Sequence, residues 1–158
     1  MNIALHWNHR EPFLTAWGRK IPCACDVRTL ENGRRKPGEI VYTLPHGKPY
    51  MPQGFPEGLW QFGRPRVRTD CYRAPFFIPT NAARMVRVWE VRDGAYYRER
   101  AEWTLDEDYG LHASASPTTL GCIRIGEPGN IYEAEDVRWL AERIEREFGT
   151  DILYFEVN

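Results

Sequence analysis

Three residues whose side chains can together perform thiol chemistry lie close together in the second half of the chain: His112, Cys122 and Arg124. A cysteine thiolate is a strong nucleophile, and a neighbouring imidazole can take the thiol proton or stabilise the thiolate. Gly121 has no side chain, so a substrate carbonyl can approach the backbone there, and the amides around Cys122 can supply an oxyanion site. Arg124, two positions beyond Cys122, shares a strand face with it and can bind a substrate carboxylate. These residue types predict a cysteine–histidine catalytic site.

Two strands and a loop have to position these groups. An alternating pattern that ends at His112 predicts a strand, and residues 121–125 predict a second one with Cys122 at its mouth. Pro117 and the small hydroxyl residues around it predict the connecting loop, which can fold His112 back against Cys122. A single cysteine is more often a small buried hydrophobic residue, and a lone histidine is usually structural. The catalytic hypothesis therefore depends on the combination.

The rest of the chain predicts a mainly β (α+β) single domain over residues 1–158. Alternating residues 85–91 and 95–105 predict a hairpin around the Asp93-Gly94 turn. Residues 133–148 predict one amphipathic helix packed on the sheet, with Gly149 as its stop and residues 152–157 as a closing strand. One apolar face of the helix is expected to contain Val137, Leu140, Ala141, Ile144 and Phe148.

The N-terminal region predicts further strands. Residues 25–30 and 39–44 are expected to be strands joined by a charged loop, because Asn32-Gly33 and residues 36–38 are turn signals. Four residues here are potential zinc ligands: His6, His9, Cys23 and Cys25. Their spacing is poor for a zinc knuckle, so an N-terminal strand pair with core-facing cysteines is the main expectation and a zinc-bound module the alternative.

An alternating series of arginines, Arg64, Arg66 and Arg68, follows a short strand expected at residues 59–62. In an extended segment these side chains share one face. A nucleic-acid contact is one role for such a series, but a solvated edge that resists strand pairing is the main expectation, with contact to an acidic peptide as a secondary role. The net charge of −1 argues against a nucleic-acid partner.

Residues 112–124 resemble the active-site signature of the L,D-transpeptidase (YkuD-type) catalytic domain. Three further segments resemble that family in the same order: residues 55–60, residues 74–79, and the pair 135–140 with 148–153. The resemblance covers roughly residues 40–157, with residues 1–39 adding N-terminal strands. It implies a β-sandwich or barrel with one C-terminal amphipathic helix packed on the sheet.

The resemblance also implies an activity: acyl transfer on peptidoglycan stem peptides through a Cys122 thioester, without a metal or cofactor. An amine acceptor would make the protein an L,D-transpeptidase, and water would make it an L,D-carboxypeptidase or endopeptidase. His112, Cys122 and Gly121 would be catalytic. The residues implied at the substrate are Arg124, Thr119, Tyr109 and Ser114.

Two positions depart from the family pattern. Ala113 stands where the family usually has glycine, and Leu120 where it often has histidine. These departures favour the alternative function, a non-catalytic cell-wall-binding, phage or secretion-associated structural module that keeps the fold.

No stretch is long and apolar enough to predict a membrane span, and the N-terminus lacks signal-peptide features. Action in the periplasm or cell wall would then require phage lysis or a dedicated secretion route; compartment and oligomeric state stay open.

Overall fold

A computed structural model of the whole chain describes the fold. The residues it describes are 1–25, 28–31, 34–37, 42–43, 49–50, 55–67, 76–92, 95–107, 109–115, 119, 121–129, 131–132 and 134–158. Several positions used in the sequence argument lie outside these ranges: Leu120, Pro117, Arg68, Asn32-Gly33, Gly38 and Asp93-Gly94.

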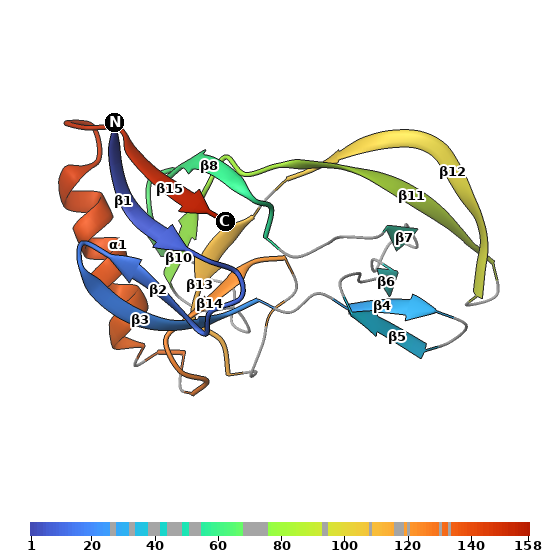
Figure 1. Cartoon of the computed structure of the whole chain (residues 1–158), viewed down its shortest axis with the longest axis horizontal. Coiled ribbons are helices and arrows are strands. Elements are labelled where there is room, and N and C mark those ends of the chain that lie inside the picture. The colour runs from blue at the N-terminus through green and yellow to red at the C-terminus, as the bar shows by residue number, and fades with distance from the viewer. Residues whose placement is uncertain are drawn as a thin grey trace.

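The described part of the chain is mainly β with one helix near the C-terminus, as expected (Figure 1). Its largest element is a nine-stranded sheet in the order β8-β15-β1-β2-β3-β14-β13-β10-β9. The strand bounds are β1 Asn2–Trp7, β2 Phe13–Ala16, β3 Arg19–Ala24, β8 Gly58–Gln61, β9 Arg66–Val67, β10 Phe76–Pro79, β13 Gly110–His112, β14 Ile123–Ile125 and β15 Leu153–Val157. Two neighbouring pairs are parallel, β1 with β15 and β13 with β14, and the others are antiparallel.

The sheet is curled and open, and the segment after β8 contacts the segment after β10. Phe62, directly after β8, forms an isolated bridge with Thr80, directly after β10. The amide of Gly63 donates to the carbonyl of Pro79 (2.8 Å), and the amide of Asn81 donates to the carbonyl of Gln61 (3.0 Å). The inner face is therefore enclosed at this point, and apolar residues collect on it.

The core fills the inside of this curl. Leu5 and Phe155 pair directly across β1 and β15, and both are fully buried. Phe155 stacks on Phe62 (5.6 Å between ring centroids), and Phe55 contacts both Phe155 and Tyr109. The aromatic rings thus link β15 to the segment that leads into β13.

Helix α1 (Glu135–Glu147) packs against the curled sheet (Figure 1). The buried residues of the helix are Val137, Leu140, Ala141 and Ile144, which confirms that part of the expected apolar face. Phe148 was expected to complete the face, and this was wrong: it is 40% exposed and its backbone is already extended (φ −64°, ψ 129°). Gly149 follows with φ +89°, a conformation that favours glycine and ends the helix.

The turn between β2 and β3 fastens the sheet to this helix. Trp17 and Gly18 both have positive φ (47° and 79°), the arrangement of a two-residue hairpin turn. The Trp17 ring lies edge-on to Trp139 of the helix (6.2 Å), and the Arg143 guanidinium lies over the Trp17 ring (4.8 Å). Trp17 therefore has a positive φ, which is unfavourable for a bulky residue, and its side chain contacts the helix from this position.

A smaller set of strands extends away from this body (Figure 1). The long hairpin of β11 (Arg84–Arg92) and β12 (Ala95–Asp106) confirms the predicted strand pair, and it continues into β7 (Pro49–Tyr50) and β6 (Tyr42–Thr43). Strands were expected at 25–30 and 39–44 with a charged loop between them. Described strands overlap the first range and lie within the second, but the expected loop was wrong, because residues 34–37 form a strand. The chain instead pairs β4 (Arg28–Glu31) with β5 (Arg34–Pro37). Glu31 pairs with Arg34, and Lys36 and Pro37 of the second turn signal lie within β5.

Within the residues described, no helix combines the length and the apolar character needed to cross a membrane.

Candidate functional site

The parallel strands β13 and β14 bring His112 and the Cys122 segment side by side. His112 pairs with Arg124 and Leu111 with Ile123, so Cys122 lies just before β14 and one step outside this ladder. From the usual strand spacing and rise, the Cα atoms of His112 and Cys122 are about 8 Å apart. Arg124 pairs with His112 and therefore shares its face of the sheet, whereas Cys122 lies in the bend directly before β14. The expected juxtaposition of His112 and Cys122 is thus compatible with this topology.

The His112 ring is held by its own backbone neighbour. Its Nδ1 lies 2.7 Å from the carbonyl oxygen of Ala113. Since a carbonyl only accepts hydrogen bonds, Nδ1 carries the hydrogen in this contact, and in a neutral imidazole Nε2 is then the proton acceptor. The half-buried His112 ring also lies 6.2 Å from the Phe77 ring of β10, at an interplanar angle of 34°. The side chain therefore has a defined tautomer and a packed face.

A tight turn delivers Cys122 to the mouth of β14. Gly121 has φ +78°, a conformation that other residues rarely adopt, and a Cβ added there would lie 3.2 Å from the Tyr109 ring. The Thr119 hydroxyl donates to the carbonyl of Cys122 and lies 3.4 Å from the carbonyl of Ala24 on β3. Thr119 is buried, so the hydroxyl braces the turn from inside. This position suits a brace for the turn more closely than the contact with substrate that the resemblance implied for Thr119.

Cys25 is a second brace, and the sequence argument missed this role. Its Sγ lies 3.6 Å from the carbonyl oxygen of Gly121, to which the thiol can donate, and it accepts from the amide of Phe55 at 3.5 Å. The thiol therefore links β3, the nucleophile turn and the segment before β8. Sequence alone considered Cys25 only as a core residue or zinc ligand, because its contacts come from distant parts of the chain.

Arg124 is more deeply placed than expected. It is 6% exposed, and its Nε donates to the carbonyl of Gly126 at 2.9 Å. A guanidinium fixed in this way is a stationary positive charge, and it acts on the buried Cys23 thiol, where it opposes the effect of burial on the pKa. Its burial leaves little surface for the substrate contact that the sequence suggested.

Tyr109 and Ser114 lie on opposite sides of His112. The Tyr109 side chain is in the core, 3% exposed, where it contacts Phe55 (5.6 Å between ring centroids) and lies under Gly121. Its position therefore supports the nucleophile turn from below. Ser114 is half-buried and lines a pocket of about 340 Å³, together with Glu127 and the beginning of α1. Ser114 therefore borders space that a ligand can enter, whereas the Tyr109 side chain is buried.

His112 belongs to a row of paired residues that crosses five strands. The members of this His112 row, from β9 to β3, are Arg66, Phe77, His112, Arg124 and Ala24. Paired residues of neighbouring strands share a face of the sheet. The Arg66 guanidinium lies over the Phe77 ring, 5.2 Å from its centroid. The row thus joins an exposed arginine to the imidazole through one aromatic ring.

The arginine series divides between two surroundings. Arg64 donates to Glu145 of α1 through Nε (2.9 Å) and Nη2 (2.8 Å), and this pairing raises the pKa of Arg64 and lowers that of Glu145. Arg66 instead faces Phe77. Arg64 therefore fastens the segment to the helix, which the alternating pattern did not distinguish from Arg66.

The four potential zinc ligands are held apart in separate contacts. His6 pairs with Glu156 (3.2 Å) and His9 with Glu57 (3.3 Å). Cys23 is 2% exposed, and burial raises the pKa of its thiol to about 12, so the thiol is neutral at physiological pH. Within the described part of the chain, no cluster of three or more histidine, cysteine or acidic side chains can hold a metal ion. The zinc-module alternative therefore has no geometric support, and the core-facing position expected for Cys23 is confirmed.

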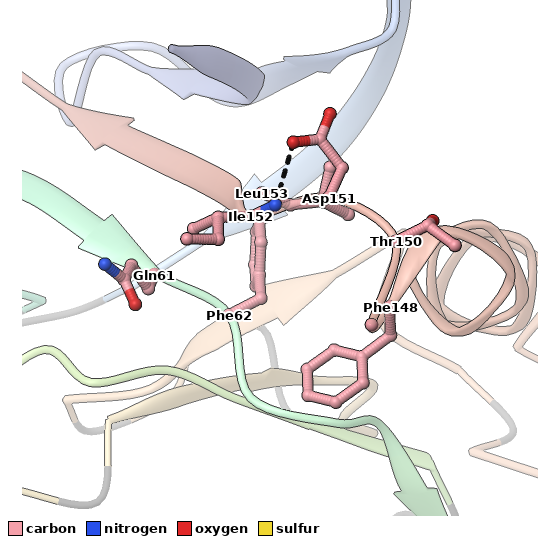
Figure 2. Close-up of a pocket in the computed structure, with 8 residues that line it drawn as sticks. Gln61, Phe62, Phe148, Thr150, Asp151, Ile152 and Leu153 are labelled. Atoms are coloured by element: carbon pink, nitrogen blue, oxygen red, sulfur yellow. Dashed lines mark hydrogen bonds between the residues drawn. The ribbon is translucent and has the colours of Figure 1, made fainter.

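A larger pocket lies elsewhere, between the end of β8 and the turn that follows α1 (Figure 2). Its volume is about 440 Å³, and its walls include Phe62, Phe148 and Ile152. The Asp151 carboxylate accepts a hydrogen bond from the amide of Ile152 at 2.9 Å, so it is occupied by its own turn (Figure 2). None of the lining residues belongs to β13 or β14. This pocket is separate from the cysteine–histidine site.

Comparisons of the chain with protein-family models, curated proteins and solved structures found no match.

Proposed function

We propose that the protein is a cysteine acyltransferase or peptidase acting on peptidoglycan stem peptides through a thioester on Cys122. The observation that carries this proposal is the hydrogen bond from His112 Nδ1 to the carbonyl of Ala113 (2.7 Å). It leaves Nε2 as the basic nitrogen of an oriented imidazole, beside a strand that begins directly after a cysteine. An oriented base next to a nucleophile is the arrangement that thiol catalysis requires.

The first half-reaction forms the thioester. Nε2 of His112 takes the proton of the Cys122 thiol, and the thiolate attacks the carbonyl carbon of a peptide bond. The amides of the Gly121–Cys122 turn stabilise the resulting oxyanion. The intermediate collapses when the C–N bond breaks, and the imidazolium returns its proton to the leaving amine.

The second half-reaction releases the acyl group. An acceptor amine or a water molecule attacks the thioester carbonyl while His112 takes one proton from it. The C–S bond then breaks, and the proton passes to the departing sulfur. An amine gives a new cross-link and water gives hydrolysis, so access of water to the thioester decides between the two reactions.

Support for a stem peptide as substrate comes from the resemblance of residues 112–124 to the L,D-transpeptidase signature. A mainly β fold with a C-terminal helix is compatible with that family. The Ala113 departure is compatible as well, because the group that holds His112 is the backbone carbonyl of residue 113, which every amino acid provides. Ala113 also has a negative φ, so this position does not require glycine.

The test is mass spectrometry of purified muropeptides incubated with wild type, Cys122→Ala and His112→Gln. Cys23→Ala is the control for loss of a thiol that is buried outside the site. We expect loss of a terminal D-residue, peptide cleavage or D-amino-acid exchange with wild type and the control only. Trapped wild type should carry the acyl mass on Cys122. Unchanged muropeptides with folded wild type, across substrates of different stem composition, would refute the enzyme and favour the non-catalytic wall-binding module.

A further inference from the structure

Arg66 occupies the exposed end of the His112 row and is the feature from which a substrate preference follows. We propose that Arg66 binds a carboxylate of the acyl-donor peptide and makes the enzyme select donors that carry it. This inference rests on the proposed function and adds a specificity-determining residue to the same site.

The register fixes where Arg66 lies relative to the imidazole. Arg66 pairs with Phe77, and Phe77 pairs with His112, so all three side chains share one face of the sheet. The guanidinium carbon is 5.2 Å from the Phe77 ring centroid, and that centroid is 6.2 Å from the His112 ring. These two distances place the positive charge within about 11 Å of the catalytic base.

Arg66 is available for a ligand, in contrast to its neighbour Arg64. Arg66 is exposed, and among the described residues no carboxylate forms an ion pair with it. The Arg64 guanidinium is instead held by Glu145. Stacking on Phe77 uses the face of the Arg66 guanidinium and leaves its N–H edges open. A planar fork held in this way is suited to bidentate recognition of a carboxylate.

The distance suits a carboxylate near the scissile bond. The reacting carbonyl has to lie close to Cys122, within reach of the His112 imidazole. The side-chain carboxylate of a diaminopimelate residue is six bonds from that carbonyl carbon and extends about 7.5 Å from it. The C-terminal carboxylate of the leaving residue is a second source of the same chemistry. Both lie within the distance that separates the Arg66 charge from the imidazole.

The experiment compares three tetrapeptide donors of sequence L-Ala-D-Glu-diaminopimelate-D-Ala. One is unmodified, one has an amidated diaminopimelate side chain, and one has an amidated C-terminus. Release of the terminal residue gives kcat/KM for wild type, Arg66→Ala, Arg66→Lys and the matched control Arg64→Ala. Arg64 and Arg66 lie two residues apart in the same exposed segment. A general loss of surface charge would therefore affect the test variant Arg66→Ala and the control Arg64→Ala alike.

We expect wild type to prefer the unmodified donor over one amidated donor by roughly 5- to 30-fold, the range for a charge-assisted hydrogen bond at a partly exposed site. Arg66→Ala should abolish that preference by raising KM for the unmodified donor. Arg66→Lys should keep part of the preference, and Arg64→Ala all of it. The donor whose amidation lowers kcat/KM for wild type identifies which of the two carboxylates is bound. A preference that survives in Arg66→Ala, or wild type that treats the three donors alike, would overturn the proposal.

The failure of the proposed function gives a different result. In that case wild type forms no thioester with any donor. Binding of the same peptides to folded Cys122→Ala and Cys122→Ala/Arg66→Ala then decides the role of Arg66. Affinity for the unmodified peptide that falls 5- to 30-fold on loss of Arg66, the range expected above, would support carboxylate binding without catalysis. Equal affinities would overturn it.

Discussion

Replacement of Gly121 by alanine tests whether the shape of the nucleophile turn controls the thiol. Gly121 has φ +78°, and an added Cβ would lie 3.2 Å from a carbon of the Tyr109 ring. The left-handed backbone costs about 1–2 kcal/mol for a residue with a side chain. The Tyr109 ring is 3% exposed and packed on Phe55, so it has little room to yield and adds to this cost.

Gly18 is a matched control, because it has nearly the same φ of +79° and no atom within 4 Å of an added Cβ. Gly18→Ala should be destabilised only by the cost of the left-handed backbone. For a domain of this size, each kcal/mol of lost stability lowers the melting temperature by about 2–4 °C. Gly121→Ala should lose more. It should also slow the alkylation of Cys122 by iodoacetamide, measured by peptide mass spectrometry, whereas Gly18→Ala should leave that rate unchanged.

Two results would refute this reasoning. Equal losses of stability in the two variants would mean that the Tyr109 ring does not restrict position 121. An unchanged alkylation rate in Gly121→Ala would mean that the turn does not set the position of the Cys122 sulfur.

Two further predictions concern the groups around the site. Thr119→Val removes the hydroxyl that donates to the Cys122 carbonyl while keeping the side-chain volume, so the free energy of unfolding in urea should fall by about 1–3 kcal/mol. Thr119→Ser should keep most of the stability and of the Cys122 alkylation rate. Equal stability of the valine and serine variants would contradict the bracing role. Burial raises the pKa of Cys23 from 9.0 to about 12, so unfolding releases a proton between these pH values, and the stability present below pH 9 should fall by up to about 1.4 kcal/mol per pH unit above it. Urea unfolding of Cys23→Val across the same pH range should show a shallower decline, and parallel curves would contradict the raised pKa.

Local patterns predicted the elements that depend on local contacts. The 84–92 and 95–106 hairpin and the buried face of α1 both follow from periodicity within one segment. Phe148 lies at helical spacing in the sequence but outside the helix, because its backbone is already extended. In the N-terminal region two turn signals lay close together, and Lys36 and Pro37 of the second one lie within a strand.

The candidate site was predictable in its residue types but not in its arrangement. The sequence places His112 before a loop and Cys122 after it, which is enough to expect them near one another. The bond from His112 to the Ala113 carbonyl depends on a side-chain rotamer, and the burial of Arg124 depends on strands from both halves of the chain. The contrast between Arg64 and Arg66 likewise comes from their different partners, α1 and β10.

The position of β15 has a consequence for how the protein is made. β15 lies between β8 and β1 and pairs with both, and the Phe155 side chain joins rings from two other segments. During synthesis β1 and β8 emerge from the ribosome long before residues 153–157, and until then they have no strand between them. The sheet that carries His112 and Cys122 therefore cannot be completed until translation has passed β15. A nascent chain arrested before that point should be sensitive to protease, even though every residue of the candidate site has already been synthesised.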